Sequence, residues 1–479
     1  MTPPDDTTPP HPDNERVPQP TAGTAQTRAE LTALRPDLVA AYDAALPGAR
    51  AAILHRLSLA VDREPLPPPA ATVDTRDPVH LVETRWPGSR LATEVDNSVA
   101  NLALARANAV PEEMPHGPQA LAVLEQSLVD GHPLHPCCRT RAGMTVADVL
   151  AYAPEHRPVI RLHRLRVPAE RWHGGGMPIL YAHPWQAPRL LAQYPWLRTA
   201  GVTRPVRPLM SLRTVAPISG GPHIKTAVDV QMTSAVRTVS PAAVHNGPIL
   251  STLLQQITAD LPIDVLAETA AGAVITDDGP DRRLAHLVRQ APRLGPGETA
   301  VPLGVLATSP MLLAAAGDPY QLIDRLGRVL FAPLARVLAR GVALEAHGQN
   351  TLLVMQDGHV KRVLYRDLGG VRVHAGRLRA AGIDTPALHG DLPTDDETEL
   401  RTKLAAAALG TVATQLIGAL DADPGKLWKT LAAGMRADPS TDTAALLSEP
   451  LPVKATTAMR LAANPLDDIW THQPNPMAA

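Results

Sequence analysis

Apolar residues recur at three- and four-residue spacing through the N-terminal part of the chain. Examples are LTALRPDLVAAYDAAL, LATEVDNSVANLALARANAV (91–110) and PQALAVLEQSLVDG (118–131). This spacing predicts amphipathic helices, and Gly131 is expected to cap the last of them. The proline-rich stretch REPLPPPAAT (63–72) interrupts the pattern and predicts a loop.

The spacing changes to short strands between about residues 150 and 235, in PVIRLHRLRV, MPILYAHPW, RPLMSLRTV and HIKTAVDVQMTSAVR. Helical spacing returns in GPILSTLLQQITADL (247–261). A second block of helices and strands begins near 320 and becomes helical from about 398 onward. This order predicts an α+β protein with helical N-terminal and mixed C-terminal regions around a largely antiparallel central sheet.

Length and charge narrow the picture further. A chain of 479 residues is expected to form two or three domains. A net charge of −2 without a long basic block argues against nucleic acid as the main partner. No run of about 18 uncharged apolar residues predicts a membrane span. The first residues lack the pattern of a signal peptide, and seven prolines among the first twenty predict a disordered tail over residues 1–26.

The segment GHPLHPCCRTRAG (131–143) carries two His-Pro pairs, two adjacent cysteines and two arginines. Cys137 and Cys138 are the only cysteines of the chain, too few for a disulfide framework and without partners for a four-ligand zinc site. They fit a reducing cytoplasm and are expected to be packing residues. Phosphate-loop, dinucleotide, serine-elbow and His-Glu-x-x-His patterns do not occur in the sequence.

Alternation in HIKTAVDVQMT places Lys225, Asp229, Gln231 and Thr233 on a polar face, opposite Ile224, Val228, Val230 and Met232. Thr233 is expected to cap a following helix, with Arg237 one turn later at the same helix mouth. In SLRT, Ser211 and Arg213 are expected on one strand face. Cations and hydroxyls of this kind suit a polyphosphate, although each residue alone could belong to a solvated strand face.

A hairpin is predicted in LEAHGQNTLLVMQDGHVKRVLYRDLGG (344–370), because Asp357-Gly358 is a strong two-residue turn. In the expected register Gln356 faces His359 and Gly348 faces Asp367. Arg366 would then lie opposite Gln349. Glu345, His347 and Gln349 would share one strand face with Asp367 beside it, an arrangement that suits Mg²⁺ on phosphate oxygens. The simpler reading is a polar sheet face with an Arg-Asp pair.

Eight motifs follow one another in the order of the IucA/IucC family, whose members are siderophore synthetases that work without a peptide synthetase template. GHPLHPCCRTRAG resembles that family's Gly-His-Pro-x-His-Pro-x-x-Lys-x-Arg-x-Gly. In addition to these eight, the upstream segment EVDNSVANL (94–102) fits the family. Downstream lie YAPE (152–155), HPWQ (183–186), SLRT (211–214), KTAVDVQMTSAVR (225–237), EAHGQNTLL (345–353), RDLGG (366–370) and MRL (459–461).

The resemblance implies a cytoplasmic, homodimeric, ATP- and Mg²⁺-dependent ligase. A carboxylic acid such as citrate would attack the α-phosphate of ATP, and an amine, hydroxylamine or alcohol would then displace AMP. The implied fold is a cupped hand. It divides the chain into the tail (1–26), a helical thumb (27–98), fingers (99–297) and a palm (298–479).

The resemblance also implies roles for individual residues. Phosphates and the charge of the transition state would be held by Ser211, Arg213, Thr214, Lys225, Thr233 and Arg237. Arg237 and His347 would orient the carboxylate. Nucleotide and metal would be held by Glu345, Gln349, Asn350 and Asp367, with Asp367 and then Glu345 as the metal ligands. The acidic substrate would contact His132, His135, Arg139 and Arg141.

Some features depart from the family and leave alternatives open. Arg139 replaces the family lysine, the Asn-His-Leu of a late helix is absent, and the chain is short after Gly370. One alternative is a phosphotransferase, which would release ADP, although Gln349 stands where a kinase base would be. Another is a non-catalytic homologue that binds a carboxylate or a ferric chelate. A ferric reductase would need a cysteine cluster, and no cysteine follows Cys138.

Overall fold

The computed structural model describes residues 22–233, 235–465 and 467–478. Most of the predicted tail lies outside these residues. Residues 24–26 are already helical, so the tail prediction is wrong for them. Helices and sheets are mixed, as the α+β class predicts. No helix within the described ranges has the length and apolarity needed to cross a bilayer.

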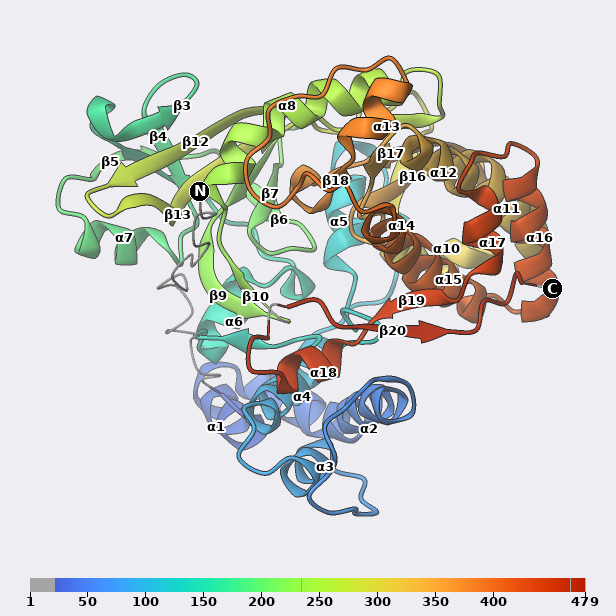
Figure 1. Cartoon of the computed structure of the whole chain (residues 1–479). Coiled ribbons are helices and arrows are strands. Elements are labelled where there is room, and N and C mark those ends of the chain that lie inside the picture. Colours follow the sequence, from blue (N-terminus) through green and yellow to red (C-terminus); the bar gives the residue numbers. More distant parts are fainter. Residues whose placement is uncertain (1–21, 234, 466, 479) are drawn as a thin grey trace, which may run out of the picture.

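Four helices gather at one end of the molecule (Figure 1): α1 (Thr24–Leu34), α2 (Val39–Arg63), α3 (Pro78–Arg85) and α4 (Leu91–Ala107). The long helices α2 and α4 pack against each other and share a core that also holds Cys137, Cys138 and Val228. The predicted packing role of both cysteines is thus confirmed. The helix predicted at 91–110 is present, and the boundary drawn at residue 98 between thumb and fingers falls inside α4.

Three antiparallel sheets form the middle of the chain. The largest has the order β3-β12-β13-β8-β7-β6, with β3 (Trp172–Gly174), β6 (Val206–Pro208), β7 (Thr214–Pro217), β8 (His223–Thr226), β12 (Glu268–Thr276) and β13 (Gly279–Arg289). A second contains β2 (His163–Arg166), β4 (Ile179–Ala182) and β5 (Arg198–Val202). A third contains β1 (Arg141–Ala142), β9 (Val228–Met232) and β10 (Ala235–Arg237). The chain passes from the first to the third sheet at Ala227, between β8 and β9.

The helices of the middle region are α5 (Ala120–Gln126), α6 (Val146–Tyr152), α7 (Ala187–Gln193) and α8 (Pro241–Ile257). Helix α8 begins six residues before the predicted start, because Ser240 caps it and Pro241 occupies its first position. Helix α5 ends at Gln126, so Gly131 is not its cap. Gly131 has φ +71°, and a Cβ there would meet the Cys138 carbonyl oxygen at 2.8 Å.

A four-stranded sheet of order β11-β17-β16-β14 supports the C-terminal region, with β11 (Ile263–Val265), β14 (Thr299–Pro302), β16 (Thr351–Gln356) and β17 (His359–Tyr365). Two strand pairs accompany it: β15 (Val342–Ala343) with β18 (Arg372–Val373), and β19 (Leu451–Lys454) with β20 (Trp470–Gln473). Strand β11 comes from the part of the chain predicted as fingers, yet it pairs in parallel with β17.

Helices cover this sheet and complete the C-terminal region: α9 (Leu303–Leu306), α10 (Pro310–Ala315), α11 (Pro319–Leu326), α12 (Ala332–Ala339), α13 (Ala375–Ala380), α14 (Glu397–Ala405), α15 (Thr414–Ala419), α16 (Pro424–Arg436), α17 (Thr443–Ser448) and α18 (Thr456–Leu461). Two π-helical segments, η6 (Gly327–Phe331) and η8 (Ala406–Ala413), continue α11 and α14. In Figure 1 the β19–β20 pair runs between these helices and the N-terminal ones. The two ends of the chain therefore meet beside the central sheets.

Candidate functional site

Strands β7 and β8 place three of the predicted residues together. Thr214 is paired in register with Lys225, and the Ser211 hydroxyl donates to the Thr214 hydroxyl at 2.9 Å. The prediction that Ser211 and Arg213 lie on a strand is wrong. Both lie in the turn between β6 and β7. Leu212 in that turn has φ +61°, a conformation that strand pairing cannot accept.

The helix predicted after Thr233 is wrong. Residues 235–237 instead pair with β9 as strand β10, and Thr233 has φ +57° in the connecting turn. The expected contact still forms, because Arg237 Nη2 donates to Thr233 Oγ1 at 2.7 Å and to the Met232 carbonyl at 3.0 Å. Strand pairing with β9 outweighs the local capping signal.

The predicted hairpin of β16 and β17 is present with its Asp357-Gly358 turn, and Gln356 faces His359 as expected. A bulge at Val354/Met355 then shifts the register by one residue, so Thr351 rather than Asn350 faces Tyr365. Residues 345–350 form a turn instead of the predicted strand, and the His347 carbonyl accepts the N–H groups of Asn350 and Thr351. The close approach of Gly348 to the Gly304 backbone, at 2.8 Å from a hypothetical Cβ, fixes this turn.

Asp367 lies just after the end of β17 and contacts Lys225 of β8. Lys225 Nζ is 2.6 Å from Asp367 Oδ1. Burial disfavours the charged carboxylate, but Lys225 and Arg213 more than offset it and hold the pKa of Asp367 well below its usual range. Asp367 has φ +70°. Five described non-glycine residues have a positive φ, and three of them, Leu212, Thr233 and Asp367, lie in this site. Such backbone strain is concentrated where function constrains the chain.

Three arginines around this pair, Arg213, Arg237 and Arg289, have no carboxylate within salt-bridge distance among the described residues, although most other buried arginines do. Burial, together with the positive charges of Arg213 and Arg141, lowers the pKa of Arg237 to about 10. Burial and the charge of Arg366 act on Arg289 in the same way. Partly buried cations that repel one another favour an anion between them.

Arg289 was missed by the sequence analysis. It lies on β13 opposite His223 of β8, where its Nη2 is 3.3 Å from His223 Nδ1. Its charge is one of those that lower the pKa of Asp367. The alternation of side chains along the RRLAHLVR strand was the signal for Arg289 in the sequence. Only the pairing of β8 with β13 shows that this strand lies beside Lys225.

His347 and His132 come from distant motifs and act on each other electrostatically. His132 Nδ1 accepts the N–H groups of Leu134 and His135, and His347 Nδ1 accepts that of Gln349, each at 3.2 Å. Both neutral rings therefore carry their proton on Nε2. Burial lowers the pKa of His132 to about 3, and the neighbouring positive charges of His347, Arg56, Lys454 and Arg237 contribute. Burial also lowers the pKa of His347.

Glu345 and Asn350 serve the turn around His347. Glu345 Oε1 is 2.9 Å from Lys403 Nζ, a partner that the sequence analysis missed. Asn350 is buried and donates to the Glu345 carbonyl at 3.4 Å. Gln349 is half-buried, and within the described part of the chain its side-chain amide makes no hydrogen bond. Gln349 thus presents a polar group beside His347.

Arg139 and Arg141 are not available to a substrate in the way the sequence suggested. Both are buried, and both pair with Glu155 of the YAPE motif at 3.1 Å. Arg139 Nε donates to the Val129 carbonyl at 2.7 Å, and its Nη2 donates to the Leu128 carbonyl. Arg139 therefore has every guanidinium nitrogen engaged by the protein. His135 is also buried, and its Nδ1 accepts the Cys137 N–H at 2.9 Å.

Other motifs hold this loop in place through buried charge pairs that the sequence analysis missed. Glu94 of EVDNSVANL pairs with Arg460 of MRL, whose Nε is 2.7 Å from Glu94 Oε2. Arg366 of RDLGG pairs with Glu125 at 2.7 Å, and its Nε donates to the Gln349 carbonyl at 3.0 Å. These contacts connect both ends of the chain to the site.

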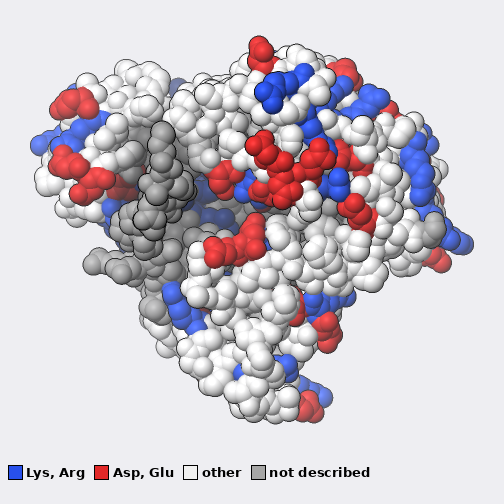
Figure 2. Space-filling view, in the orientation of Figure 1, with Lys and Arg blue, Asp and Glu red and all other residues white. Residues whose placement is uncertain are grey.

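The molecular surface is hollowed near its centre, and Lys and Arg side chains are visible inside the hollow while acidic side chains gather along its rim (Figure 2). Among the described residues there is no cluster of three or more His, Cys, Asp or Glu side chains that could hold a metal by itself. A hard cation would therefore have to share its coordination with a bound anion.

Family comparison agrees with this arrangement. The model of the IucA / IucC family matches residues 120–178 and 175–308. A second model, of ferric iron reductase FhuF-like transporters, matches residues 321–464, a segment without cysteine. Staphyloferrin A synthase of Staphylococcus aureus is 27% identical over 354 residues, covering 62% of this chain and 60% of that protein. The chain spans 54 to 65% of the length of the first three curated relatives that it matches.

Two solved structures share the fold. The petrobactin biosynthesis protein AsbB of Bacillus anthracis has a TM-score of 0.72 at 19% identity, over 81% of this chain and 78% of that one. ATP-bound aerobactin synthetase IucA of Klebsiella pneumoniae has a TM-score of 0.66 at 20% identity, over 81% and 82%. The ordered motifs and the matched model agree that residues 120–308 resemble the IucA/IucC family, and the two solved structures share the fold.

Proposed function

We propose that the protein is an ATP-dependent ligase that joins a carboxylic acid to an amine, hydroxylamine or alcohol in the assembly of a siderophore or a related natural product. The observation that carries the proposal is the set of Arg213, Arg237 and Arg289, which surround the Lys225–Asp367 pair without carboxylate partners of their own. A triphosphate supplies the negative charge that this set lacks. The relatives named above support the same class.

The reaction begins when a carboxylate oxygen attacks the α-phosphorus of ATP and pyrophosphate leaves. Arg213, Lys225 and Arg237, with the Ser211 and Thr214 hydroxyls, stabilise the charge that develops on the phosphate oxygens. Neutral His347 donates from Nε2 to the acid and orients it. The nucleophile then attacks the acyl carbon of the adenylate, loses its proton and displaces AMP. Citrate is the first acid to test, because a polyanion suits the cationic site.

Asp367 fits Mg²⁺ better than Glu345 does. Its carboxylate stays ionised, and Lys225 contacts only Oδ1. Glu345 is held by Lys403 and is packed against Gly370, where a Cβ would lie 2.1 Å from its Oε2. Bound with ATP, the metal would neutralise charge on the phosphates. His132 would complete the acid site from the opposite side.

Hydroxylamine trapping tests the proposal. Purified protein, ATP, Mg²⁺ and a panel of di- and tricarboxylates are assayed for pyrophosphate and AMP. AMP formed with one acid establishes the ligase and names its acyl donor. ADP would instead identify a phosphotransferase. ATP binding without either product would identify a non-catalytic homologue.

The same proposal extends to the architecture. Helices α1 to α4 correspond to the thumb, the central sheets to the fingers and the β16–β17 sheet with its helices to the palm, as the cupped-hand resemblance implies. Cytoplasmic location and a homodimer belong to the proposal as well. Equilibrium sedimentation tests the dimer.

A further inference from the structure

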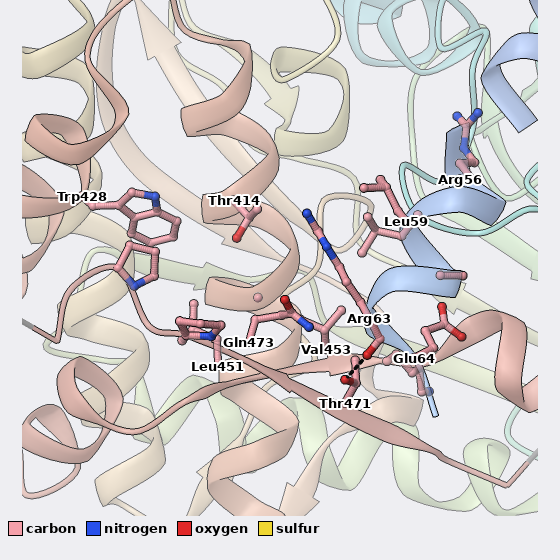
Figure 3. A pocket seen from close by; sticks show the side chains of 16 residues that line it. Arg56, Leu59, Arg63, Glu64, Thr414, Trp428, Leu451, Val453, Thr471 and Gln473 are labelled. Atoms are coloured by element: carbon pink, nitrogen blue, oxygen red, sulfur yellow. Dashed lines mark hydrogen bonds between the residues drawn. The ribbon is translucent and has the colours of Figure 1, made fainter. Parts of the chain in front are cut away.

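A cavity of about 230 Å³ lies where the two ends of the chain meet (Figure 3). One wall is α2, with Arg56, Leu59 and Arg63. Facing it are η8, α15 and α16 with Thr414 and Trp428, and the β19–β20 pair closes the base. The volume accommodates roughly eight non-hydrogen atoms, since a water molecule's share of the liquid is about 30 Å³.

The lining combines an apolar body with cationic groups. Leu59, Leu134, Trp428, Leu451 and Val453 supply most of the surface. The exposed Arg63 side chain extends into the cavity between Leu59 and Thr414 (Figure 3), and no carboxylate of residues 22–233, 235–465 or 467–478 lies within salt-bridge distance of its guanidinium.

The other charged groups of the lining are already engaged. Arg56 donates to the carbonyls of Ala52, Asp130 and His132. Glu64 accepts the N–H groups of Thr457 and Ala458, each at 2.8 Å. Lys454 pairs with Asp468 at 2.7 Å. The unmatched group of the cavity is therefore Arg63, which favours a carboxylate and repels a polyamine.

The cavity adjoins the candidate active site. Leu134 lies within the His-Pro-Leu-His-Pro loop, two residues after His132, and its N–H donates to His132 Nδ1. Arg56 Nε donates to the His132 carbonyl at 3.2 Å. The charge of Lys454 acts on both His132 and Glu345. A ligand in the cavity thus lies next to the residues proposed to hold the acid.

We propose that this cavity binds the acyl acceptor, and that the acceptor is an amine with an apolar body and a carboxylate at its far end. The carboxylate pairs with Arg63, the chain contacts Leu59, Leu134 and Trp428, and the amine faces the His132 side. The inference rests on the proposed ligase function. A citrate-sized tricarboxylate does not suit an apolar lining, so the acid and the acceptor occupy different sites.

The test compares 5-aminopentanoate with pentylamine, which lacks the carboxylate, and with spermidine, which has only cations. With the full chain, ATP, Mg²⁺ and the acid that supports pyrophosphate release, amide formation is measured for each amine. We expect a KM for 5-aminopentanoate at least tenfold below those of the other two. A preference for pentylamine or spermidine would overturn the inference.

Three variants locate the effect. Arg63→Glu should raise the KM for 5-aminopentanoate at least tenfold while the KM for ATP changes little. Lys429→Glu reverses an exposed charge beside Trp428 but outside the lining, and should match the wild type. Thr414→Trp fills the cavity from an exposed position and should abolish transfer. An unchanged KM in Arg63→Glu would refute the assigned contact, whether or not Thr414→Trp folds.

Direct binding separates this inference from the proposed function. Saturation-transfer NMR of 5-aminopentanoate needs no turnover. Binding that Arg63→Glu weakens, in a protein that adenylates no acid, would retain the site and refute the ligase. Adenylation without binding or selectivity among the amines would retain the ligase and refute the site.

Discussion

Two sets of arginines, one buried and one partly buried, lie in the family-like motifs and differ in their charge partners. Arg139 and Arg141, in the loop after the His-Pro pairs, share Glu155. Arg213 and Arg237, in the β6–β7 turn and on β10, have no such carboxylate among the described residues, and the charge of Arg213 lowers the pKa of Arg237. The first pair is balanced within the protein and so stabilises the fold. The second has no paired carboxylate, and under the proposed function a bound anion balances it.

The comparison shows that motif membership alone does not define a residue's role. Arg366 and Arg460 also lie in family motifs, and both are neutralised by glutamates brought from far along the chain. A buried cation without an anionic partner is more informative, because the free-energy cost of removing its charge from water persists unless a ligand offsets it.

The largest effect on stability is expected from Glu155→Ala. This change leaves Arg139 and Arg141 buried without their shared carboxylate, which should lower the free energy of unfolding by about 3–5 kcal/mol. Chemical denaturation measures it. As a control, Asp43→Ala removes the exposed partner of Arg28 and should have little effect. A loss in Glu155→Ala as small as in the control would contradict the structural role.

Arg237→Ala should show the opposite behaviour. Loss of one donor to the transition state should reduce pyrophosphate release by about 100-fold or more. The free energy of unfolding should stay the same or rise, because a repulsion with Arg213 disappears. Arg237→Lys keeps the positive charge but loses the planar guanidinium with its paired donors, and should retain intermediate activity. Wild-type turnover in Arg237→Ala would remove it from the mechanism.

Asp367→Asn should raise the Mg²⁺ concentration needed for half-maximal pyrophosphate release by about tenfold, because a neutral amide is a weaker ligand. Glu345→Gln should change it less, since Lys403 already holds that carboxylate. Mg²⁺ titrations of both variants measure the difference. Equal titrations for Asp367→Asn and the wild type would point to another ligand.

His132→Gln should change the pH dependence of stability. The pKa of His132 is about 3 in the folded protein and near 6.5 when unfolded. The unfolded state therefore takes up a proton first as pH falls below 6.5, and His132 lowers stability progressively as the pH falls toward 3. Denaturation at pH 7 and pH 5 should show a shallower slope in the variant. An equal slope would mean that His132 is not buried neutral.

Sequence predicted much of the fold where neighbours along the chain decide it. The helix at 91–107 and the Asp357-Gly358 hairpin followed from local spacing and turn chemistry. The bulge at Val354/Met355 could not be predicted, because packing against both adjacent strands sets it. The helix expected after Thr233 failed for the same reason, since β9 offered residues 235–237 a strand partner.

For the candidate site, the sequence identified the residue types, and the tertiary structure decided which charged residues pair with one another. The ordered motifs determined the family, and the residues Lys225, Arg237, His347 and Asp367 could be named from them. Only the fold decided that Glu155 neutralises Arg139 and Arg141, that Glu94 reaches Arg460 across 366 positions, and that Arg289 acts with Arg213 on Asp367. Periodicity depends on neighbours along the chain, whereas Coulomb energy depends on distance in space, and that distance is fixed only by folding.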